Sequence, residues 1–363
     1  MSGGRLKFSP PPLIGPQYSN NVLTVVLEPP RIVPLTCHGH SRPITHLSFS
    51  SIVDDDQYYL ISACKDNNPM LRDGMTGDWI GTFIGHKGAV WSSRLSSDAK
   101  IAATGSADFT ARIWDPRTGE CLHILTHNHI VRAVSFPIQE NPLCVATGGQ
   151  DKKLKIFDLS RGGSAASPEQ ANGTSPITPT TTSEGHEIGA GEHGGSIKSI
   201  VWNVDYNILT TASDDKTIRW WDLRTQHAIA SVKTDRDITS CELSTNRAED
   251  SDPGILSVAA GHSCFFFDAG RPGEVIKQVN FDHDVASVAI NPSSGRFVTG
   301  GGVDTWVRVW DFAHEKELEV LKGHHGPIWS IAFSPDGKIY ATGSEDGTIK
   351  LWKSCKEPYG LWR

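Results

Sequence analysis

The chain repeats one phrase along its length, and this repetition constrains the fold more than any other feature. The segment ATGSADFTARIW at 103–114 returns as ATGSEDGTIKLW at 341–352, with seven of twelve positions identical. More divergent copies are ISACKDNNPMLR (61–72), ATGGQDKKLKIF (146–157), TASDDKTIRWW (211–221), AAGHSCFFF (259–267) and VDTWVRVW (303–310). A phrase that recurs along a whole chain indicates a structural unit that packs against copies of itself.

Each copy follows a segment with apolar residues at relative positions 0, +3 and +5. These segments begin at residues 44, 90, 131, 197, 238, 285 and 328, so five of the six intervals lie between 41 and 47 residues. Such intervals are typical of a propeller blade with four strands. Short runs rich in Val, Ile, Thr and aromatic residues, separated by Gly, Asp and Asn turns, predict strands. The sequence therefore predicts an all-β, seven-bladed WD-repeat β-propeller.

A set of polar residues recurs at fixed places in the blades. A His precedes the apolar segment by four residues, an Asp lies in the repeated phrase, a Ser or Thr precedes that Asp, and a Trp follows it. Because the His can bond both the Asp and the hydroxyl, we expect a buried hydrogen-bonded network in each blade. The predicted network residues are His40, Ser62, Asp66, His86, Thr104, Asp108, Trp114, His127, Thr147, Asp151, His193, Thr211, Asp215, Trp221, Asp304, Trp310, His324, Thr342, Asp346 and Trp352.

Thr, His and Asp are also the components of a hydrolytic triad, which is the alternative interpretation of this set. A nucleophile needs exposure and an oxyanion hole, whereas each Ser or Thr here lies inside a predicted strand. Five or more catalytic sites in one chain would also be unreasonable. The sequence favours the structural interpretation, and we expect no enzymatic activity, no metal and no cofactor.

Two blades depart from the polar set. Blade five has Thr234, Gly261 and Phe267 in place of the His, Asp and Trp, and blade six has Phe281 in place of the His. We expect these two blades to be the least stable of the seven.

Closure of the ring needs a strand from the other end of the chain. The last blade lacks an outer strand, and residues 31–37 are predicted to supply it, since closure removes open sheet edges. The predicted propeller spans 31–355, after a Pro-rich flexible extension at 1–30 and before a C-terminal segment at 356–363. The one long interval, of 66 residues, is explained by 160–185, where 17 of 26 residues are Ser, Thr, Pro or Gly, which predicts a disordered insert.

Charge and hydropathy argue against several classes of function. The net charge of −7 disfavours general binding to nucleic acid, and no stretch of 18 apolar residues could span a membrane. The seven Cys are scattered without a CxxC pair, and the N-terminus lacks the pattern of a signal peptide. We expect a monomeric propeller within a larger complex, located in the cytoplasm and nucleus, with no direct contact with membranes or nucleic acids.

The 0/+3/+5 pattern breaks strict strand alternation, which implies a bulge that re-aims the +1 side chain towards the mouth of the central channel. The +1 residues are Thr45, Trp91, Arg132, Lys198, Thr239, Ala286 and Trp329. Trp and Arg are favoured in binding hot spots, so we predict a partner-binding arc, suited to an apolar and acidic peptide, made of Trp91, Trp329, Arg132, Lys198 and Thr45. The alternative is that both Trp side chains only fill the channel.

Several stretches go beyond the general repeat pattern. They include PLTCHGHSRPI (34–44), LISACKDNNPMLRDGMTGDWIGTFIGHKGAVW (60–91), GHHGPIWSIAFSPDG (323–337) and YGLW (359–362). These stretches resemble the family of serine/threonine kinase receptor-associated proteins, also called unr-interacting proteins. The resemblance implies a non-enzymatic adaptor that joins the survival-of-motor-neuron complex through Gemin subunits, in the assembly of spliceosomal small nuclear ribonucleoproteins and in mRNA processing. It also implies an association with the RNA-binding protein unr and, in animals, a scaffold role in kinase-receptor signalling.

A second family shares part of this pattern. The i subunit of eukaryotic translation initiation factor three is a seven-bladed propeller with similar GHxGPI and GHxGAVW phrases. The segments KDNNPMLRDG and YGLW favour the first family.

Overall fold

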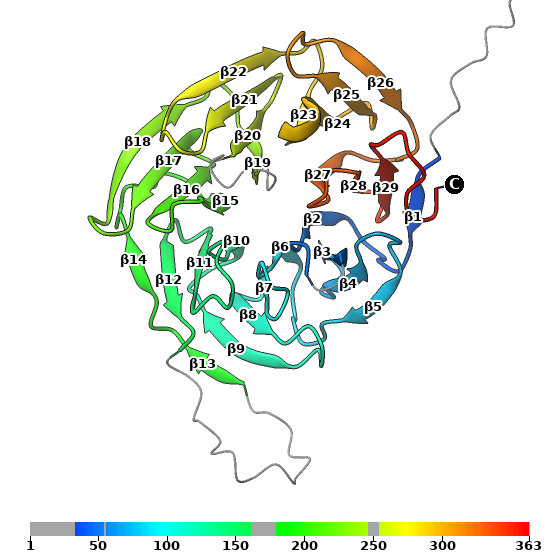
Figure 1. Ribbon diagram of the computed structural model, residues 1–363. Helices are drawn as coiled ribbons and strands as arrows, with labels where there is room; N and C mark the ends of the chain where they lie inside the picture. Colours follow the sequence, from blue (N-terminus) through cyan, green and yellow to red (C-terminus); the bar gives the residue numbers. More distant parts are fainter. Residues whose placement is uncertain (1–32, 54–55, 161–178, 246–253, 363) are drawn as a thin grey trace, which may run out of the picture. The chain divides into compact units, whose positions relative to one another are not determined.

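The computed structural model describes residues 33–53, 56–160, 179–245 and 254–362. These described residues form one compact unit, in which seven sheets are arranged in a ring (Figure 1). The prediction of an all-β, seven-bladed propeller is therefore confirmed. The predicted extension at 1–30 and most of the predicted insert at 160–185 lie outside the described residues. No helix among the residues described is long and apolar enough to cross a membrane.

In each blade the first strand lies nearest the centre of the ring and the next two follow outward in chain order, all paired antiparallel (Figure 1). Blades one to three contain β2 (Ile44–Phe49), β3 (Tyr59–Cys64), β4 (Met70–Asp73) and β5 (Trp79–Thr82); β6 (Val90–Leu95), β7 (Ala102–Ser106), β8 (Thr110–Trp114) and β9 (Cys121–Thr126); and β10 (Val131–Ser135), β11 (Cys144–Gly149), β12 (Leu154–Asp158) and β14 (His186–Ile188).

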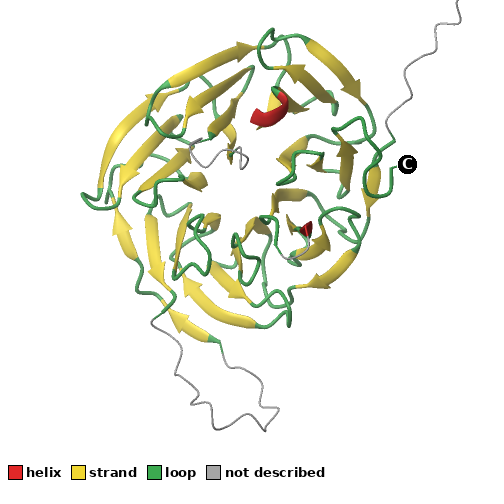
Figure 2. Cartoon of the chain, in the orientation of Figure 1, coloured by secondary structure: helices red, strands yellow, loops and turns green. Residues whose placement is uncertain are grey.

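Blades four to seven repeat the arrangement. They contain β15 (Ile197–Trp202), β16 (Ile208–Ser213), β17 (Thr217–Asp222) and β18 (His227–Lys233); β19 (Ile238–Ser244), β20 (Ile255–Ala260), β21 (Ser263–Asp268) and β22 (Val275–Asn280); β23 (Val285–Asn291), β24 (Arg296–Gly301), β25 (Val307–Asp311) and β26 (Glu317–Leu321); and β27 (Ile328–Phe333), β28 (Ile339–Ser344), β29 (Ile349–Lys353) and β1 (Leu35–Cys37). A short 3-10 turn, η2 (Pro292–Ser294), joins the first two strands of blade six (Figure 2).

Strand β1 closes the ring. It pairs antiparallel with β29 over three residues, from Leu35 opposite Leu351 to Cys37 opposite Ile349, which confirms the predicted closure by an N-terminal strand. The C-terminal segment reinforces the same junction, because the indole N–H of Trp362 donates to the backbone carbonyl of Val33 at 3.0 Å. The segment predicted as separate from the propeller thus packs against it.

The apolar core is divided into seven clusters, one between each pair of neighbouring blades. Between blades one and two, for example, Leu71 and Phe83 pack against Trp114. The cluster between blades seven and one includes Cys37, with Leu35, Tyr359 and Trp362 packed against it. Because each blade buries its two faces against its two neighbours, an open ring would expose the faces of both terminal blades.

The insert in blade three adds a strand that the sequence does not predict. Residues Thr180–Thr182 form β13, which pairs parallel with β9 at the outer edge of blade two and makes that blade five-stranded. The prediction of disorder through residue 185 is therefore wrong at its C-terminal end. Thr residues favour strands, and an unpaired edge beside them offers free backbone hydrogen-bonding groups.

Candidate functional site

The predicted polar network is complete in blades two and seven. The His86 Nδ1 lies 2.8 Å from Asp108 Oδ2, His86 Nε2 lies 2.7 Å from Thr104 Oγ1, and the Trp114 indole N–H donates to Thr104 Oγ1 at 2.8 Å. Burial lowers the pKa of His86, so the neutral ring donates from Nδ1 to Asp108 and accepts at Nε2 from Thr104. Every donor in this chain of bonds has an acceptor. Blade seven repeats it with His324, Asp346, Thr342 and Trp352.

The burial of the hydroxyl groups argues against a hydrolytic triad at these positions. The side chains of Ser62, Thr104 and Thr342 are fully buried, with relative exposures of 0%. The Thr104 oxygen is also shared between His86 and Trp114, so no face of it is open to a substrate. A nucleophile in this place could not reach a scissile bond, and we assign the set to the stability of the blades.

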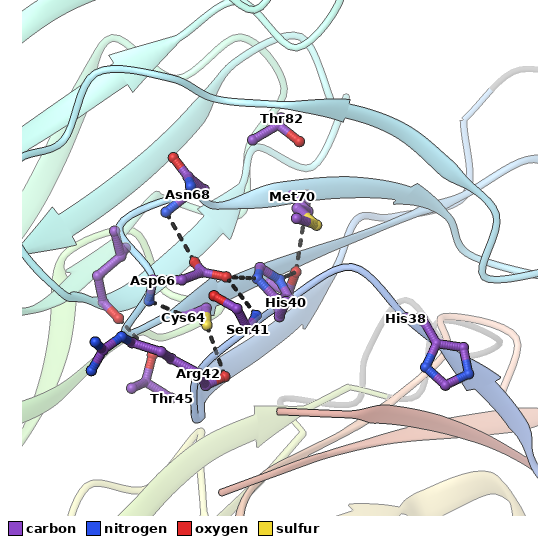
Figure 3. Close-up of polar contacts among 12 residues, drawn as sticks. His38, His40, Ser41, Arg42, Thr45, Cys64, Asp66, Asn68, Met70 and Thr82 are labelled. Carbon is purple, nitrogen blue, oxygen red and sulfur yellow. Dashed lines mark hydrogen bonds and ion pairs between the residues drawn. The ribbon is translucent and has the colours of Figure 1, made fainter. Parts of the chain in front are cut away.

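Blade one carries the network without a Trp, and it contains a cluster with metal-ligating atoms (Figure 3). The His40 Nδ1 lies 2.8 Å from Asp66 Oδ2, and Nε2 lies 2.8 Å from Ser62 Oγ. Together with the Cys64 sulfur, His40 and Asp66 place three potential ligand atoms within 4.8 Å of one another.

The other blades explain this cluster without a metal. The Cys64 Sγ donates to the carbonyl of Arg42 at 3.0 Å and accepts from the Asp66 backbone N–H at 3.4 Å. In blades two and seven, the hydroxyls of Ser106 and Ser344 make the two equivalent contacts. Burial raises the pKa of the Cys64 thiol to about 12, whereas a metal ligand must be a thiolate. Cys64 therefore occupies a serine position of the repeat.

Replacing Cys64 by Ser is expected to leave the protein folded, with a change in the free energy of unfolding below about 1 kcal/mol. The smaller hydroxyl can make both hydrogen bonds, as Ser106 and Ser344 do. Thermal unfolding of both proteins with and without a chelator measures this. A chelator that lowers the melting temperature of the wild type, and not that of Cys64→Ser, would establish a metal site instead.

Blade three forms only part of its network. His127 Nε2 lies 3.1 Å from Thr147 Oγ1, but its Nδ1 lies 3.6 Å from Asp151 Oδ2, which is too long for a hydrogen bond. Phe157 stands where blades two and seven have Trp, and its ring packs against His127 with a centroid distance of 5.5 Å. The predicted bond between His127 and Asp151 is therefore not formed.

Blade four replaces the predicted contact of His193 with Asp215 by a bridge through Arg219. The Arg219 Nη1 donates to Asp215 Oδ2 at 2.9 Å and to His193 Nδ1 at 3.1 Å. Because a guanidinium group only donates, His193 must be unprotonated at Nδ1, the opposite tautomer to His86. Its Nε2 then donates to Thr211 Oγ1 at 3.3 Å, and the Trp221 indole N–H donates to the same oxygen at 2.8 Å.

Blade six keeps the bond between Trp and Thr of the network, but the Thr is one that the sequence pattern missed. The Trp310 indole N–H donates to Thr299 Oγ1 at 2.9 Å, and Asp304 pairs with Arg308. Thr299 precedes Asp304 by five residues, one more than in the other blades, so a search with a fixed spacing overlooks it. Phe281, which stands at the sequence position of the network His, packs against Trp310 with a centroid distance of 4.9 Å, and the ring of His283 stacks on the same Trp.

The stability of the protein is expected to fall as the pH drops from about 6.5 to about 4, partly because of His193. Burial and the positive charge of Arg219 lower the pKa of His193 from 6.5 to about 4, against the opposing charge of Asp215. In this window His193 binds a proton in the unfolded chain but not in the folded chain. Its contribution to the free energy of unfolding is therefore complete above pH 6.5 and is lost progressively as the pH falls towards 4. From pH 7 to pH 5 the loss is about 2 kcal/mol.

Urea unfolding at both pH values, for the wild type and for His193→Gln, measures this contribution. The variant lacks the titrating ring. Between pH 7 and pH 5 it should therefore lose about 2 kcal/mol less of its free energy of unfolding than the wild type does. Equal pH dependence of the two proteins would show that His193 does not titrate in this way.

The +1 residues of the innermost strands come together at one mouth of the ring. The register of every innermost strand shifts after its first residue, as the apolar pattern predicts, and the +1 residue falls in the shift. Six of these residues line a single cavity of about 310 Å³, which we call the mouth cavity: Thr45, Trp91, Arg132, Lys198, Thr239 and Trp329. The seventh, Ala286, is buried and lines a neighbouring cavity that also reaches Trp329.

The predicted partner-binding residues divide into two groups at this cavity. The Thr45 hydroxyl donates to the carbonyl of Val90 at 2.7 Å, and the Lys198 ammonium donates to the carbonyl of Ile238 at 3.1 Å, so both link neighbouring blades. Trp329 makes no such link to any described residue and is 37% exposed. Two cations approach the ring of Trp91, with Lys65 Nζ 5.3 Å and the Arg132 guanidinium carbon 5.1 Å from its centroid. Lys65 also lines the mouth cavity and was not among the predicted residues.

A half-buried ion cluster forms the floor of the mouth cavity. Glu242 of blade five accepts from Arg94 of blade two at 2.7 Å and contacts His46 Nε2 of blade one at 3.0 Å. Burial opposes its ionisation, but Arg94 and His46 together keep the pKa of Glu242 below its usual value. Arg94 and Glu242 also line the cavity at the opposite mouth, of about 510 Å³. The cluster therefore separates the two ends of the channel.

Comparison with known proteins assigns the family. The WD domain, G-beta repeat, model matches residues 77–115, 119–158, 178–222, 275–311 and 315–353. Serine-threonine kinase receptor-associated proteins of Mus musculus and Homo sapiens are both 42% identical over 92% of this chain and 86% of their own length. The protein of that name from Dictyostelium discoideum is 41% identical over 88% of this chain and 98% of its own length. The chain belongs to the family of serine-threonine kinase receptor-associated proteins.

The chain is more distantly related to the second family that the sequence analysis considered, the i subunit of initiation factor three. Eukaryotic translation initiation factor 3 subunit I of Culex quinquefasciatus is 29% identical over 88% of this chain. The WD-repeat model leaves 223–274 unmatched, and this stretch holds the three inner strands of blade five, where Gly261 and Phe267 replace the Asp and Trp of the polar network. The WD repeats and the family together support a scaffold role for this chain, and the mouth cavity gives the scaffold a surface for a partner.

Proposed function

We propose that this chain is a non-enzymatic adaptor subunit of the survival-of-motor-neuron complex, in which it supports assembly of spliceosomal small nuclear ribonucleoproteins and thereby mRNA processing. The observation that carries the proposal is 42% identity over 92% of the chain to serine-threonine kinase receptor-associated proteins. Gemin subunits and an unr-like RNA-binding protein are the proposed partners. The proposed locations are the cytoplasm and the nucleus.

The geometry supports an adaptor in two respects. The Ser and Thr hydroxyls that could suggest nucleophilic catalysis are fully buried in the network of the blades. The mouth cavity, in contrast, offers an exposed Trp329 beside Trp91 and Arg132, and Trp and Arg are the residues that most often dominate binding energy at interfaces. We propose that the adaptor docks one of its partners at this mouth.

The names of similar proteins suggest two further candidate functions. The similar proteins of Mus musculus and Homo sapiens are named for association with a serine-threonine kinase receptor, which makes a signalling scaffold the second candidate. Subunit I of initiation factor 3 is the third, at the lower identity of 29%.

Affinity capture of the tagged chain from native cells at low salt, with mass spectrometry of the bound proteins, separates the three. The proposal predicts Sm proteins together with Gemin-like subunits. Recovery of initiation factor subunits, or of a receptor kinase without Sm proteins, would contradict it in favour of the corresponding candidate.

A further inference from the structure

The charges around the mouth cavity are almost all neutralised within the protein. Four cationic side chains line it, and Arg94 is paired with Glu242 on the floor. Lys198 and Arg132 share the carboxylate of Asp214, at 2.6 Å and 3.3 Å. The fourth, Lys65, has no carboxylate within ion-pair distance among the residues described here.

Lys65 and Asp214 occupy the same place in two different blades. Each directly precedes the Asp of the polar network, Lys65 before Asp66 and Asp214 before Asp215. The turn that supplies an acid for Arg132 and Lys198 in blade four thus supplies a free cation in blade one. Lys65 opens the KDNNPMLRDG segment that distinguishes blade one from the other blades.

Trp91 and Trp329 give the mouth cavity an apolar wall. Trp91 has Lys65 and Arg132 against its ring, which restrains the orientation of the indole. Trp329 lies in the wall shared by the mouth cavity and its neighbour and keeps 37% of its surface exposed. A large aromatic side chain that stays exposed beside a cavity has apolar surface to bury against a ligand.

We propose that the mouth cavity binds a short segment of a partner protein in which an apolar side chain stands next to an Asp or Glu. This proposal rests on the proposed adaptor function. The apolar side chain packs against Trp91 and Trp329, and the neighbouring carboxylate pairs with Lys65. Glu242 on the floor repels a carboxylate that enters more deeply, which keeps the acidic group at the rim.

The same charge pattern disfavours a nucleic acid at this mouth. Binding to a phosphate backbone gains affinity from several cations at once, whereas Lys65 is the one cavity cation without an acidic partner within the described part of the chain. Phosphates beyond the first would meet Asp214 and Glu242, which already hold Lys198, Arg132 and Arg94. A volume of about 310 Å³ is at the lower end of ligand pockets and suits one or two side chains.

Selection from a displayed library of random eight-residue peptides tests the proposal directly. Peptides enriched on the wild type should carry an apolar residue adjacent to Asp or Glu, and they should bind Trp91→Ala/Trp329→Ala at least about 30-fold more weakly. Lys65→Gln should weaken them about fivefold to tenfold. Lys65→Glu should select peptides with Lys or Arg in place of the acid, while the control Lys152→Glu, on the corresponding turn of blade three, should select the original class.

Three outcomes overturn the proposal: no enrichment on the wild type, enriched peptides that bind the double Trp variant equally well, or an unchanged peptide class after Lys65→Glu. Binding of a twenty-residue oligouridine that requires Lys65 and is tighter than any selected peptide would also overturn it, in favour of RNA. Melting temperatures of the variants show that each remains folded. If selection fails while capture from cells still recovers Sm proteins and Gemin-like subunits, the mouth proposal falls and the adaptor function stands.

Discussion

A chain that begins at residue 38 is expected to lose most of its stability, because it lacks the strand that closes the ring. The deletion removes the three-residue pairing of β1 with β29 and the burial of Leu35 and Cys37 between blades seven and one. It also removes the carbonyl of Val33 that holds Trp362. Lost hydrogen bonds and apolar burial together amount to about 5 kcal/mol, which is comparable to the whole stability of many domains.

Deletion of residues 1–28 is the matched control, since it shortens the same end of the chain and spares β1. We expect its melting temperature to stay close to that of the full chain, whereas the chain that begins at residue 38 should unfold at a much lower temperature or aggregate. Equal melting temperatures of the two deletions would show that β1 does not hold the ring together.

Asp108→Ala is expected to destabilise the protein by about 3 kcal/mol. The carboxylate accepts hydrogen bonds from His86 Nδ1, from the Lys87 backbone N–H at 3.0 Å and from both the backbone N–H and the hydroxyl of Thr110. Without it, the His86 ring keeps a buried donor with no acceptor, and such a group costs more than the bond itself contributed. Denaturant unfolding measures the difference from the wild type.

The control is Asp115→Ala in the same blade. The Asp115 carboxylate pairs with the Arg117 side chain, which is 84% exposed, and accepts the Arg117 backbone N–H at 2.8 Å. The partner is exposed, and an exposed ion pair contributes at most about 1 kcal/mol. A loss of stability in Asp108→Ala no larger than in Asp115→Ala would contradict the role assigned to the network.

The fold follows from the sequence because each blade is a local unit with its own signals. The apolar positions of segments such as 90–95 and the turn residues around Asp108 lie within one interval of the repeat, so their spacing alone predicts strands, bulge and blade. The need to pair the edge of β29 then predicts the closing strand at 31–37. None of these steps requires knowledge of contacts between distant segments.

The sequence is less informative where a contact depends on three-dimensional neighbours. Arg219 replaces the direct bond of His193 to Asp215 because its long side chain reaches both, which the repeat spacing does not reveal. Thr299 was missed because one extra residue shifts it from the common position. Strand β13 lies between two strands of blade three in the chain, but it pairs with β9 of blade two.

At the mouth, the pattern of the repeat identified the residues and the structure separated their roles. The bulges place six +1 residues around one cavity, as the sequence suggests. The hydrogen bonds of Thr45 and Lys198 to neighbouring blades depend on which side chains meet across blades, and so does the lack of a carboxylate for Lys65 among the described residues. Those contacts lie beyond a pattern that treats every blade separately.

The measurement that tests the central claim most directly is affinity capture of partners by three forms of the chain from the same native cells. The forms are the wild type, Trp91→Ala/Trp329→Ala, and Trp79→Ala, which alters a 59% exposed Trp on the outer strand β5 of blade one. We predict that the wild type and Trp79→Ala retain the same partners and that the double variant, although folded, loses at least one of them. Retention of every partner by the folded double variant would contradict the claim that this adaptor docks a partner at its mouth.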